Sequence, residues 1–160
     1  MALSKDEIRD TYPLPVYNYK VTVQDDGAAP TVAFSEVSGL SMEYKPVTYR
    51  HGLSFAMGFN IIPGMPEPVR LTLKKGLVKG NDFLLRWIDE SNNEPLAGAS
   101  KRDVVIDLCD ETGTPVIRWT VLGALPTKLD APGFDAGSNE VAIESLDLIA
   151  HGLKVEHEPV

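Results

Sequence analysis

The chain has 160 residues, of which 43% are hydrophobic, and this content suffices for one buried core without a metal or a disulfide to support it. The formal net charge is −8 and no basic run exists, which argues against a surface that binds nucleic-acid phosphates. The single cysteine, Cys109, excludes an intramolecular disulfide. We therefore predict one domain over residues 1–160, made in the cytoplasm.

The first twelve residues form a charged N-terminal extension. They lack the apolar stretch that a signal peptide requires. No segment of the chain approaches the roughly 20 uncharged apolar residues of a membrane-spanning helix. We expect a protein that is soluble when it is made. The first strand is predicted over residues 17–24, where apolar and polar residues alternate.

The segment from Leu53 to Pro66 contains no charged residue. A buried central strand would explain this composition. Glycine and proline residues surround and interrupt the segment, however, and they favour a projecting β-hairpin arm. Another subunit would have to cover the apolar face of such an arm, because an exposed apolar edge aggregates. The predicted subunit-interface residues are the large members of the alternation: Leu53, Phe55, Met57, Phe59 and Ile61.

Further strands are predicted over residues 69–74, 103–108 and 116–125 from the same period-two alternation. The turn cluster Asp110–Gly113 joins the last two of these as a hairpin. Apolar residues at helical spacing predict one short helix from Asp82 to Ser91. A change of phase between Ile143 and Leu146 predicts a bulge or bend in a long C-terminal strand. The predicted fold is mainly β, an antiparallel β-barrel or closed sandwich with one short α-helix and the projecting arm.

Candidate catalytic and metal-binding residues are few. The three histidines, His51, His151 and His157, are isolated and show no zinc-ligand spacing. Cys109 has no basic neighbour in the sequence to lower its pKa, so it is interpreted as a structural thiol. We predict no catalytic residue, no cofactor and no metal, and hence no enzyme.

Charged residues are interpreted in the same way. Asp107 with Asp110, or Glu140 with Glu144, could pair for acid–base chemistry, but a solvated strand face is the simpler interpretation. The glycine-containing segment 132–137 lacks the lysine of a phosphate-binding loop, and in an assembly it could contact a second copy. The only basic cluster is Lys74, Lys75 and Lys79, which we interpret as an exposed strand end that meets an acidic partner.

Five segments resemble the inner tail-tube family of contractile injection systems, which includes the tubes of contractile phage tails and of phage-tail-like extracellular particles. In chain order they are Tyr12–Pro15, Phe34–Leu40, Pro66–Leu77, Arg102–Ile106 and Asn139–Leu146. The second of these, with the sequence FSEVSGL, is the most recognisable. The resemblance spans most of the chain.

The resemblance implies a β-barrel subunit that forms homohexameric rings, and the rings stack into a hollow tube that delivers cargo through a target envelope. Its implied partners are copies of itself and neighbouring tube, sheath or baseplate proteins, with no specific binding of nucleic acid and no membrane contact outside the assembled particle. The implied location is a phage tail or an extracellular contractile particle, after synthesis in the bacterial cytoplasm. Whether the cargo is DNA or a protein toxin is not specified.

Two departures from the family pattern suggest a minor, baseplate-proximal variant of the tube. The N-terminal extension is longer than in the shortest members, and the predicted arm is more apolar than in abundant tube subunits. Two alternatives stay open. The chain could be a secreted hexameric ring protein of a type VI secretion apparatus, or a monomeric β-barrel that binds a small ligand and buries the uncharged segment as an internal strand.

Overall fold

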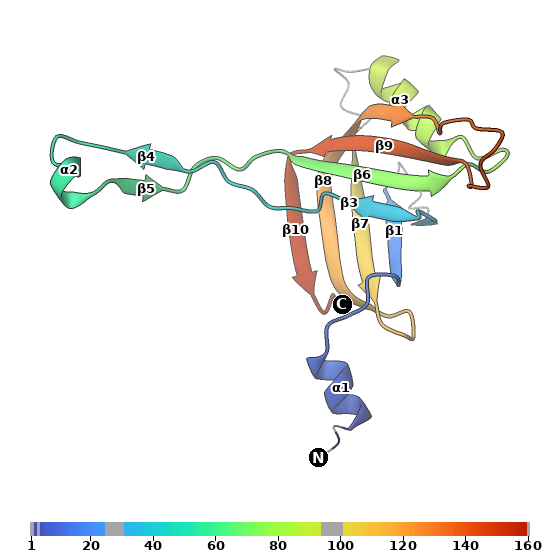
Figure 1. The fold of residues 1–160 in the computed structure, drawn as a ribbon, viewed down its shortest axis with the longest axis horizontal. Helices are drawn as coiled ribbons and strands as arrows, with labels where there is room; N and C mark the ends of the chain where they lie inside the picture. The colour runs from blue at the N-terminus through green and yellow to red at the C-terminus, as the bar shows by residue number, and fades with distance from the viewer. Residues whose placement is uncertain (1, 3, 25–30, 94–100, 160) are drawn as a thin grey trace.

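A computed structural model describes residues 2, 4–24, 31–93 and 101–159 (Figure 1). Its elements are, in chain order, α1 (Lys5–Thr11), β1 (Tyr19–Val23), β2 (Thr31–Val32), β3 (Glu36–Ser38), β4 (Val47–Tyr49), α2 (Ser54–Met57), β5 (Asn60–Ile62), β6 (Val69–Gly76), α3 (Phe83–Asn93), β7 (Arg102–Cys109), β8 (Pro115–Asp130), β9 (Ile143–Ala150) and β10 (Gly152–His157). The prediction of a mainly β protein is confirmed. The prediction of a single helix is wrong, since three helices lie within the described ranges.

The body of the protein consists of two antiparallel layers that share the long strand β8. The first half of β8 pairs with β7 and β10, and β1 and β2 extend this layer beyond β7. The second half of β8 pairs with β9, which continues to β6 and β3. We call these the β1–β10 layer and the β3–β9 layer; their strands cross at a steep angle (Figure 1). No closed barrel forms among the described strands of one protomer.

A glycine allows β8 to pass from one layer to the other. Gly123 has φ +64°, a conformation that residues with a side chain rarely adopt. A Cβ atom at this position would lie 2.5 Å from His151 Nδ1. The Gly123 amide donates a hydrogen bond of 2.9 Å to Asp103 Oδ1. The bend therefore depends on glycine both for its backbone conformation and for its space.

The core lies between the two layers, and α3 closes one end of it. Leu84 and Trp87 on α3 are fully buried, as the helical spacing of these residues predicted. Arg102 connects α3 to β7: its guanidinium lies 5.4 Å from the Trp87 ring centroid and 5.5 Å from that of Phe83, and Nη2 donates to Glu90 Oε2 over 2.9 Å. The layers contribute the remaining core: Val21, Val23, Phe34, Val69, Leu71, Leu73, Val104, Ile106, Val121, Ala124, Leu146, Leu148 and Ala150.

The predicted strands of the body and the β7–β8 hairpin are confirmed with one correction, whereas β2, β3 and β10 were not predicted. The register of β9 against β6 is continuous from Ile143 to Ala150, so the predicted bulge in the C-terminal strand is wrong. The irregularity lies instead in β8, where Thr127 is the extra residue opposite β9. Ile143 is out of phase with Leu146 because it lies at the exposed start of the strand.

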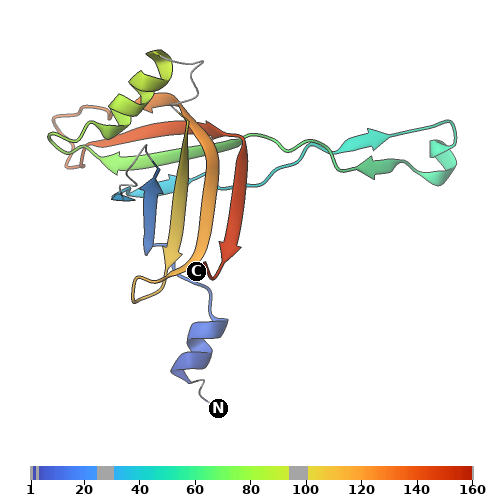
Figure 2. The same cartoon turned by 180° about the vertical axis from the view of Figure 1, so that it is seen from behind.

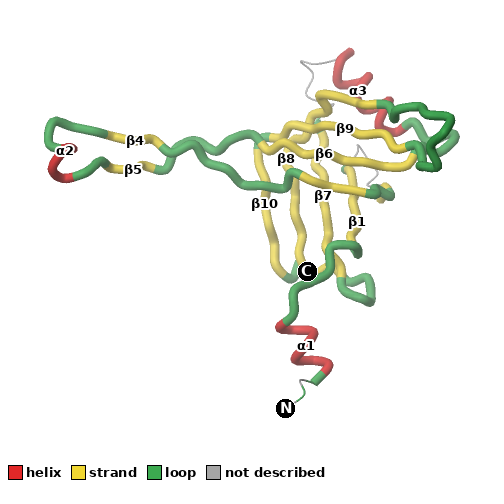
Figure 3. The backbone as a smooth tube through the Cα atoms, in the orientation of Figure 1, coloured by secondary structure: helices red, strands yellow, loops and turns green. Residues whose placement is uncertain are grey.

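A hairpin formed by β4, α2 and β5 projects from the body, and we call residues 47–62 the arm (Figures 1 and 3). Val47 pairs with Ile62, and the Tyr44–Pro66 bridge lies at the base of the arm. The projection agrees with the prediction, but the strand predicted through residues 53–61 is wrong. Ser54–Met57 is a helical turn that ends at Gly58, whose φ is +80°. The outgoing strand β4 lies entirely before the predicted segment.

Candidate assembly interface

The candidate titratable residues do not converge on a reactive site. His51 lies in the arm, His151 at the junction of β9 and β10, and His157 at the end of β10. In the part of the chain that the structure describes, no three His, Cys, Asp or Glu side chains are placed to hold a metal ion. Cys109 is buried, and this burial raises the pKa of its thiol, which agrees with a structural role.

Ion pairing within the body corrects two sequence interpretations. Lys75 lies on the core side of β6 with its side chain 2% exposed, and its Nζ is 2.7 Å from Glu144 Oε1 on the neighbouring strand. It is therefore not part of an exposed basic strand end, and Glu144 does not point into solvent. Lys74 is exposed and pairs with Glu36 at 3.4 Å. The predicted basic cluster thus contributes less positive charge to the surface than its sequence suggests.

All five predicted interface residues lie in the arm and are exposed. Phe55 is 90% exposed, Met57 75% and Ile61 68%. None of the five belongs to the core cluster or packs against it. The Arg50 guanidinium lies 5.0 Å from the Phe59 ring centroid. The arm therefore presents a largely apolar surface to solvent in the isolated protomer.

The FSEVSGL segment forms one wall of the body. Phe34 enters the core, and its carbonyl accepts a 2.7 Å hydrogen bond from the Tyr19 hydroxyl. Gly39 has φ +94°, and a Cβ atom there would lie 2.1 Å from the Arg70 carbonyl oxygen. Val37 and Leu40 are only partly buried and pack against the edge of the core. These contacts give a physical reason for the residue types along this segment.

An apolar groove opens between this wall and the β1–β10 layer. Its volume is about 350 Å³. Its apolar lining comes from β1, β3, β7, β8 and the segments next to them, and comprises Val16, Tyr19, Val37, Leu40, Ile106, Leu108 and Trp119. The side chains of Tyr19 and Trp119 are half-buried here although they lie on the core-facing side of their strands. We call this surface the apolar groove; the sequence analysis did not predict it.

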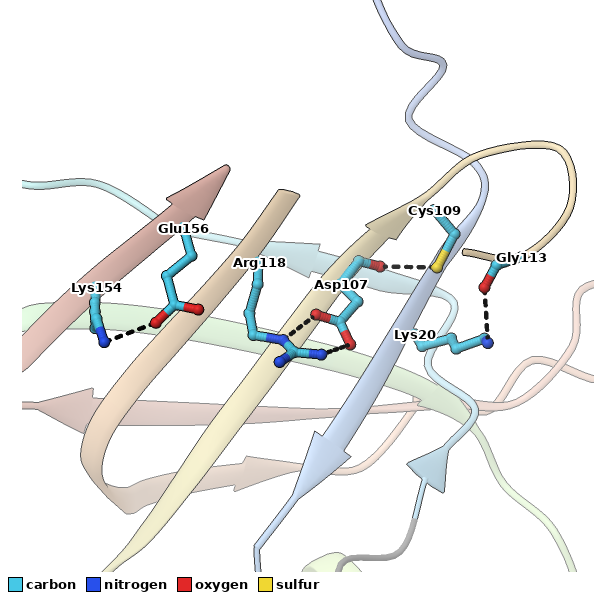
Figure 4. Close-up of polar contacts among 7 residues, drawn as sticks. All are labelled: Lys20, Asp107, Cys109, Gly113, Arg118, Lys154 and Glu156. Carbon is cyan, nitrogen blue, oxygen red and sulfur yellow. Dashed lines mark hydrogen bonds and ion pairs between the residues drawn. The ribbon is translucent and has the colours of Figure 1, made fainter. Parts of the chain in front are cut away.

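The opposite face of the β1–β10 layer carries a row of charges of alternating sign. Lys20 pairs in register with Asp107, Asp107 with Arg118, and Arg118 with Glu156. The row therefore crosses β1, β7, β8 and β10 from one side of the layer to the other (Figure 4).

Two ion pairs hold this row together. Arg118 donates to both carboxylate oxygens of Asp107, over 2.7 and 3.2 Å, and the bond to Asp107 raises the pKa of Arg118. Lys154 Nζ lies 2.7 Å from Glu156 Oε1, and this contact lowers the pKa of Glu156. The alternation within each strand indicates which of its residues point outward. The row itself depends on the register between the strands and was not predicted.

The two sides of the β1–β10 layer end in strands with free edges. Among the described residues no strand pairs with the outer edge of β10. On the other side, β2 pairs with Val21 and Thr22, and no strand of the described ranges pairs with Tyr19 or Lys20 on that edge. Unpaired edges of this kind are templates for strand addition.

No helix among the described residues has the length and apolar composition needed to cross a membrane. No curated protein matches the sequence.

The family model for the T4-like virus tail tube protein gp19 matches residues 15–154. A chain from the sheath-tube complex of the extracellular contractile injection system PVC, in the extended state, is 33% identical, with 98% of this chain and 99% of that chain covered and a TM-score of 0.84. A chain from the tube-terminating cap of the anti-feeding prophage is 34% identical, with 98% and 99% coverage and a TM-score of 0.80. A chain from the PVC sheath/tube terminator is also 34% identical, with 91% and 97% coverage and a TM-score of 0.79. The chain belongs to the T4-like tail tube protein family.

Proposed function

We propose that the chain is a structural subunit whose copies form hexameric rings, and that these rings stack into the inner tube of a contractile injection particle or phage tail. The observation that carries the proposal is the arm, which exposes large apolar side chains at the end of a well-packed body. Burying each of these side chains against a neighbouring subunit contributes about 1.5–3 kcal/mol to the free energy of association. Family membership supports the tube as the product of that assembly.

In this assembly the outward face of the β1–β10 layer lines the lumen. Figure 2 displays this layer from behind, with no helix and no strand of the β3–β9 layer in front of it. The face carries charges of both signs in alternation, although the whole chain has a net charge of −8. Because positive and negative side chains alternate on this face, it has no cluster of like charge that would bind a polymer passing through the lumen. Affinity for a polyanion requires clustered cations. A barrel closes only when several copies join their layers.

The arm residues Leu53, Phe55, Met57, Phe59 and Ile61 are the subunit-interface residues in this proposal. Partners of the ring are further rings, and sheath, terminator or baseplate proteins. The proposed role requires no cofactor and no catalysis. Synthesis in the bacterial cytoplasm precedes assembly into the particle.

The test compares the wild-type protein with a Phe55→Asp/Phe59→Asp variant by negative-stain electron microscopy and mass photometry. We expect rings or short tubes for the wild type, and a folded protomer of 17.5 kDa for the variant, because two buried carboxylates would cost far more than the contact contributes. Leu85→Asp is the matched control, since Leu85 on α3 is 50% exposed but lies outside the arm, and this variant keeps the ring. A wild-type protein that stays monomeric at micromolar concentration contradicts the proposal and favours the ligand-binding alternative.

A further inference from the structure

The segment between α1 and β1 carries apolar side chains that the body leaves uncovered. Val16 is 84% exposed, Tyr17 81% and Tyr12 57%. We call residues 12–17 the strap. Before it in the chain, α1 lies apart from the two layers, past the end of the body that carries the β7–β8 turn (Figures 1 and 2). A helix of seven residues is marginal without a surface to pack on. The strap and α1 therefore present apolar surface that their position in the structure leaves in solvent.

The strap is fixed to the body at one end and packs loosely at the other. The carbonyl of Asn18, directly after the strap, accepts a 2.8 Å hydrogen bond from the Cys109 amide. Val16 contributes to the lining of the apolar groove. Tyr12 and Leu14 instead line a separate hollow of about 200 Å³ beside the β7–β8 turn. The fixed end of the strap thus lies at the groove, while its other end covers the body incompletely.

We infer that in the free protomer the strap turns about the bend at Val16 and Tyr17 and closes over the apolar groove of its own chain, with Tyr12 and Leu14 inside. The position in the structure is then the open one, which a subunit adopts in a ring. The closed strap acts as a brake on assembly. This role rests on the proposed ring, whereas closure itself is a property of the single protomer.

The composition of the strap suits an apolar groove. Pro13 and Pro15 have no backbone N–H, so the strap brings fewer unpaired donors into an apolar surface. Tyr12 has φ −88° and ψ 145°, close to the values of polyproline II. Proline-containing segments in this conformation bind grooves lined by aromatic rings. Tyr19 and Trp119 supply such rings in the groove.

The connection through Val16 makes closure within one chain more favourable than binding of a second molecule. Tyr12 is four residues from Val16, which corresponds to roughly 12 Å at about 3.1 Å per residue of polyproline II. A short connection of this kind gives an effective concentration on the order of millimolar. In a micromolar solution the strap therefore closes over the groove before another molecule occupies it.

Closure affects assembly because the strap adjoins a free strand edge. Tyr19 and Lys20, which follow the strap almost directly, pair with no strand of the described ranges on the outer edge of β1. The proposed ring requires the layers of several copies to join. A strap that lies over the groove beside Tyr19 obstructs this part of the layer, so a neighbouring copy reaches it only after the strap opens.

Tryptophan quenching tests closure in the monomeric Phe55→Asp/Phe59→Asp variant. Trp119 lines the groove, whereas Trp87 is fully buried and reports that the fold is intact. We expect Tyr12→Ser/Leu14→Ser to raise the acrylamide quenching constant of Trp119 at least about twofold, because the strap then leaves the groove open. The matched control is Val78→Ser/Leu85→Ser, since Val78 and Leu85 are 63% and 50% exposed and lie outside the strap and the groove. The control leaves the quenching constant unchanged.

A disulfide tests the position of the closed strap. Tyr12→Cys is combined with Glu36→Cys, an exposed position on the groove, in a Cys109→Ala background of the same monomeric variant. We expect an intramolecular disulfide to form at least about tenfold faster than in the matched control Tyr12→Cys/Lys154→Cys, because closure raises the effective concentration of the first pair. Lys154 belongs to the charged face on the other side of the layer. Equal rates, or a Trp119 that is quenched equally with and without the strap side chains, overturn the inference.

The same disulfide tests the brake in protein with the wild-type arm. Tyr12→Cys/Glu36→Cys/Cys109→Ala is oxidised in dilute solution and then concentrated for electron microscopy. We expect the oxidised protein to remain monomeric and to form rings after addition of dithiothreitol. Rings from the oxidised protein overturn the brake and leave the proposed function standing. Absence of rings in the wild type overturns the proposed function and the brake with it, while the two measurements on the monomer still decide whether the strap closes.

Discussion

The body and the arm are built from similar apolar residues but expose them to opposite extents. In the body, Leu71 and Leu73 on β6 are 1% and 0% exposed, because the second layer and α3 cover them. In the arm, Phe55 and Met57 are 90% and 75% exposed, because a two-stranded hairpin has no second layer. An isolated hairpin is only marginally stable in water. The body thus covers its apolar side chains by itself, whereas the described part of the protomer supplies no layer that covers the arm.

The largest difference in stability between the two regions is expected when a large side chain is replaced by alanine in each of them. Trp87→Ala removes a fully buried ring on α3 and is expected to lower the free energy of unfolding by about 4 kcal/mol. Met57→Ala in the arm is expected to change it by less than about 0.5 kcal/mol. Both are measured by chemical denaturation in the monomeric Phe55→Asp/Phe59→Asp background. Equal losses at the two positions would mean that the arm packs on its own body.

Two neighbouring lysines on β6 provide a finer comparison within the body. Lys75→Ala leaves Glu144 buried without its cation, and we expect a loss of about 3 kcal/mol. Lys74→Ala removes an exposed pair with Glu36 and is expected to cost less than about 1 kcal/mol. The double variant Lys75→Met/Glu144→Leu is expected to recover most of the loss, because it removes both buried charges. Similar denaturation midpoints for the two single variants would show that Lys75 is hydrated.

Sequence patterns predicted the body better than the arm for a physical reason. In the body, burial on one side enforces the alternation of β1, β6 and β7, so period two reports the strand. In the arm no burial enforces it, and Gly52 and Gly58 instead delimit the helical turn of α2. The projection could be predicted because residues 53–66 lack charge and contain or adjoin glycine and proline residues, but the internal structure of the arm could not.

Two further features depended on information that was partly present in the sequence. Helix α1 was missed although Ser4 and Glu7 form a complete capping box, with the Ser4 side chain accepting from the Glu7 amide. The Lys75–Glu144 pair and the apolar groove require the register of β6 against β9 and the position of β3 against the other layer. Such contacts between distant segments follow from topology, which a single sequence does not specify.

The smallest effect is expected from cysteine reactivity, which compares the same side chain in both regions. Cys109 is 0% exposed, and its burial raises the pKa of the thiol, so the sulfur is inaccessible and forms the reactive thiolate less readily than a solvated thiol does. A Phe55→Cys thiol in the arm would be solvated in the monomer. We expect the arm thiol to react with a maleimide at least about 100-fold faster, since reaction at Cys109 requires local opening of the strand end. The rates are measured separately, in the Phe59→Asp background, with Cys109 as the only thiol in one protein and replaced by alanine in the other. Comparable rates would mean that the junction of β7 with the Asp110–Gly113 turn opens as readily as the arm is exposed, and the body would then not be the complete fold that its buried side chains indicate.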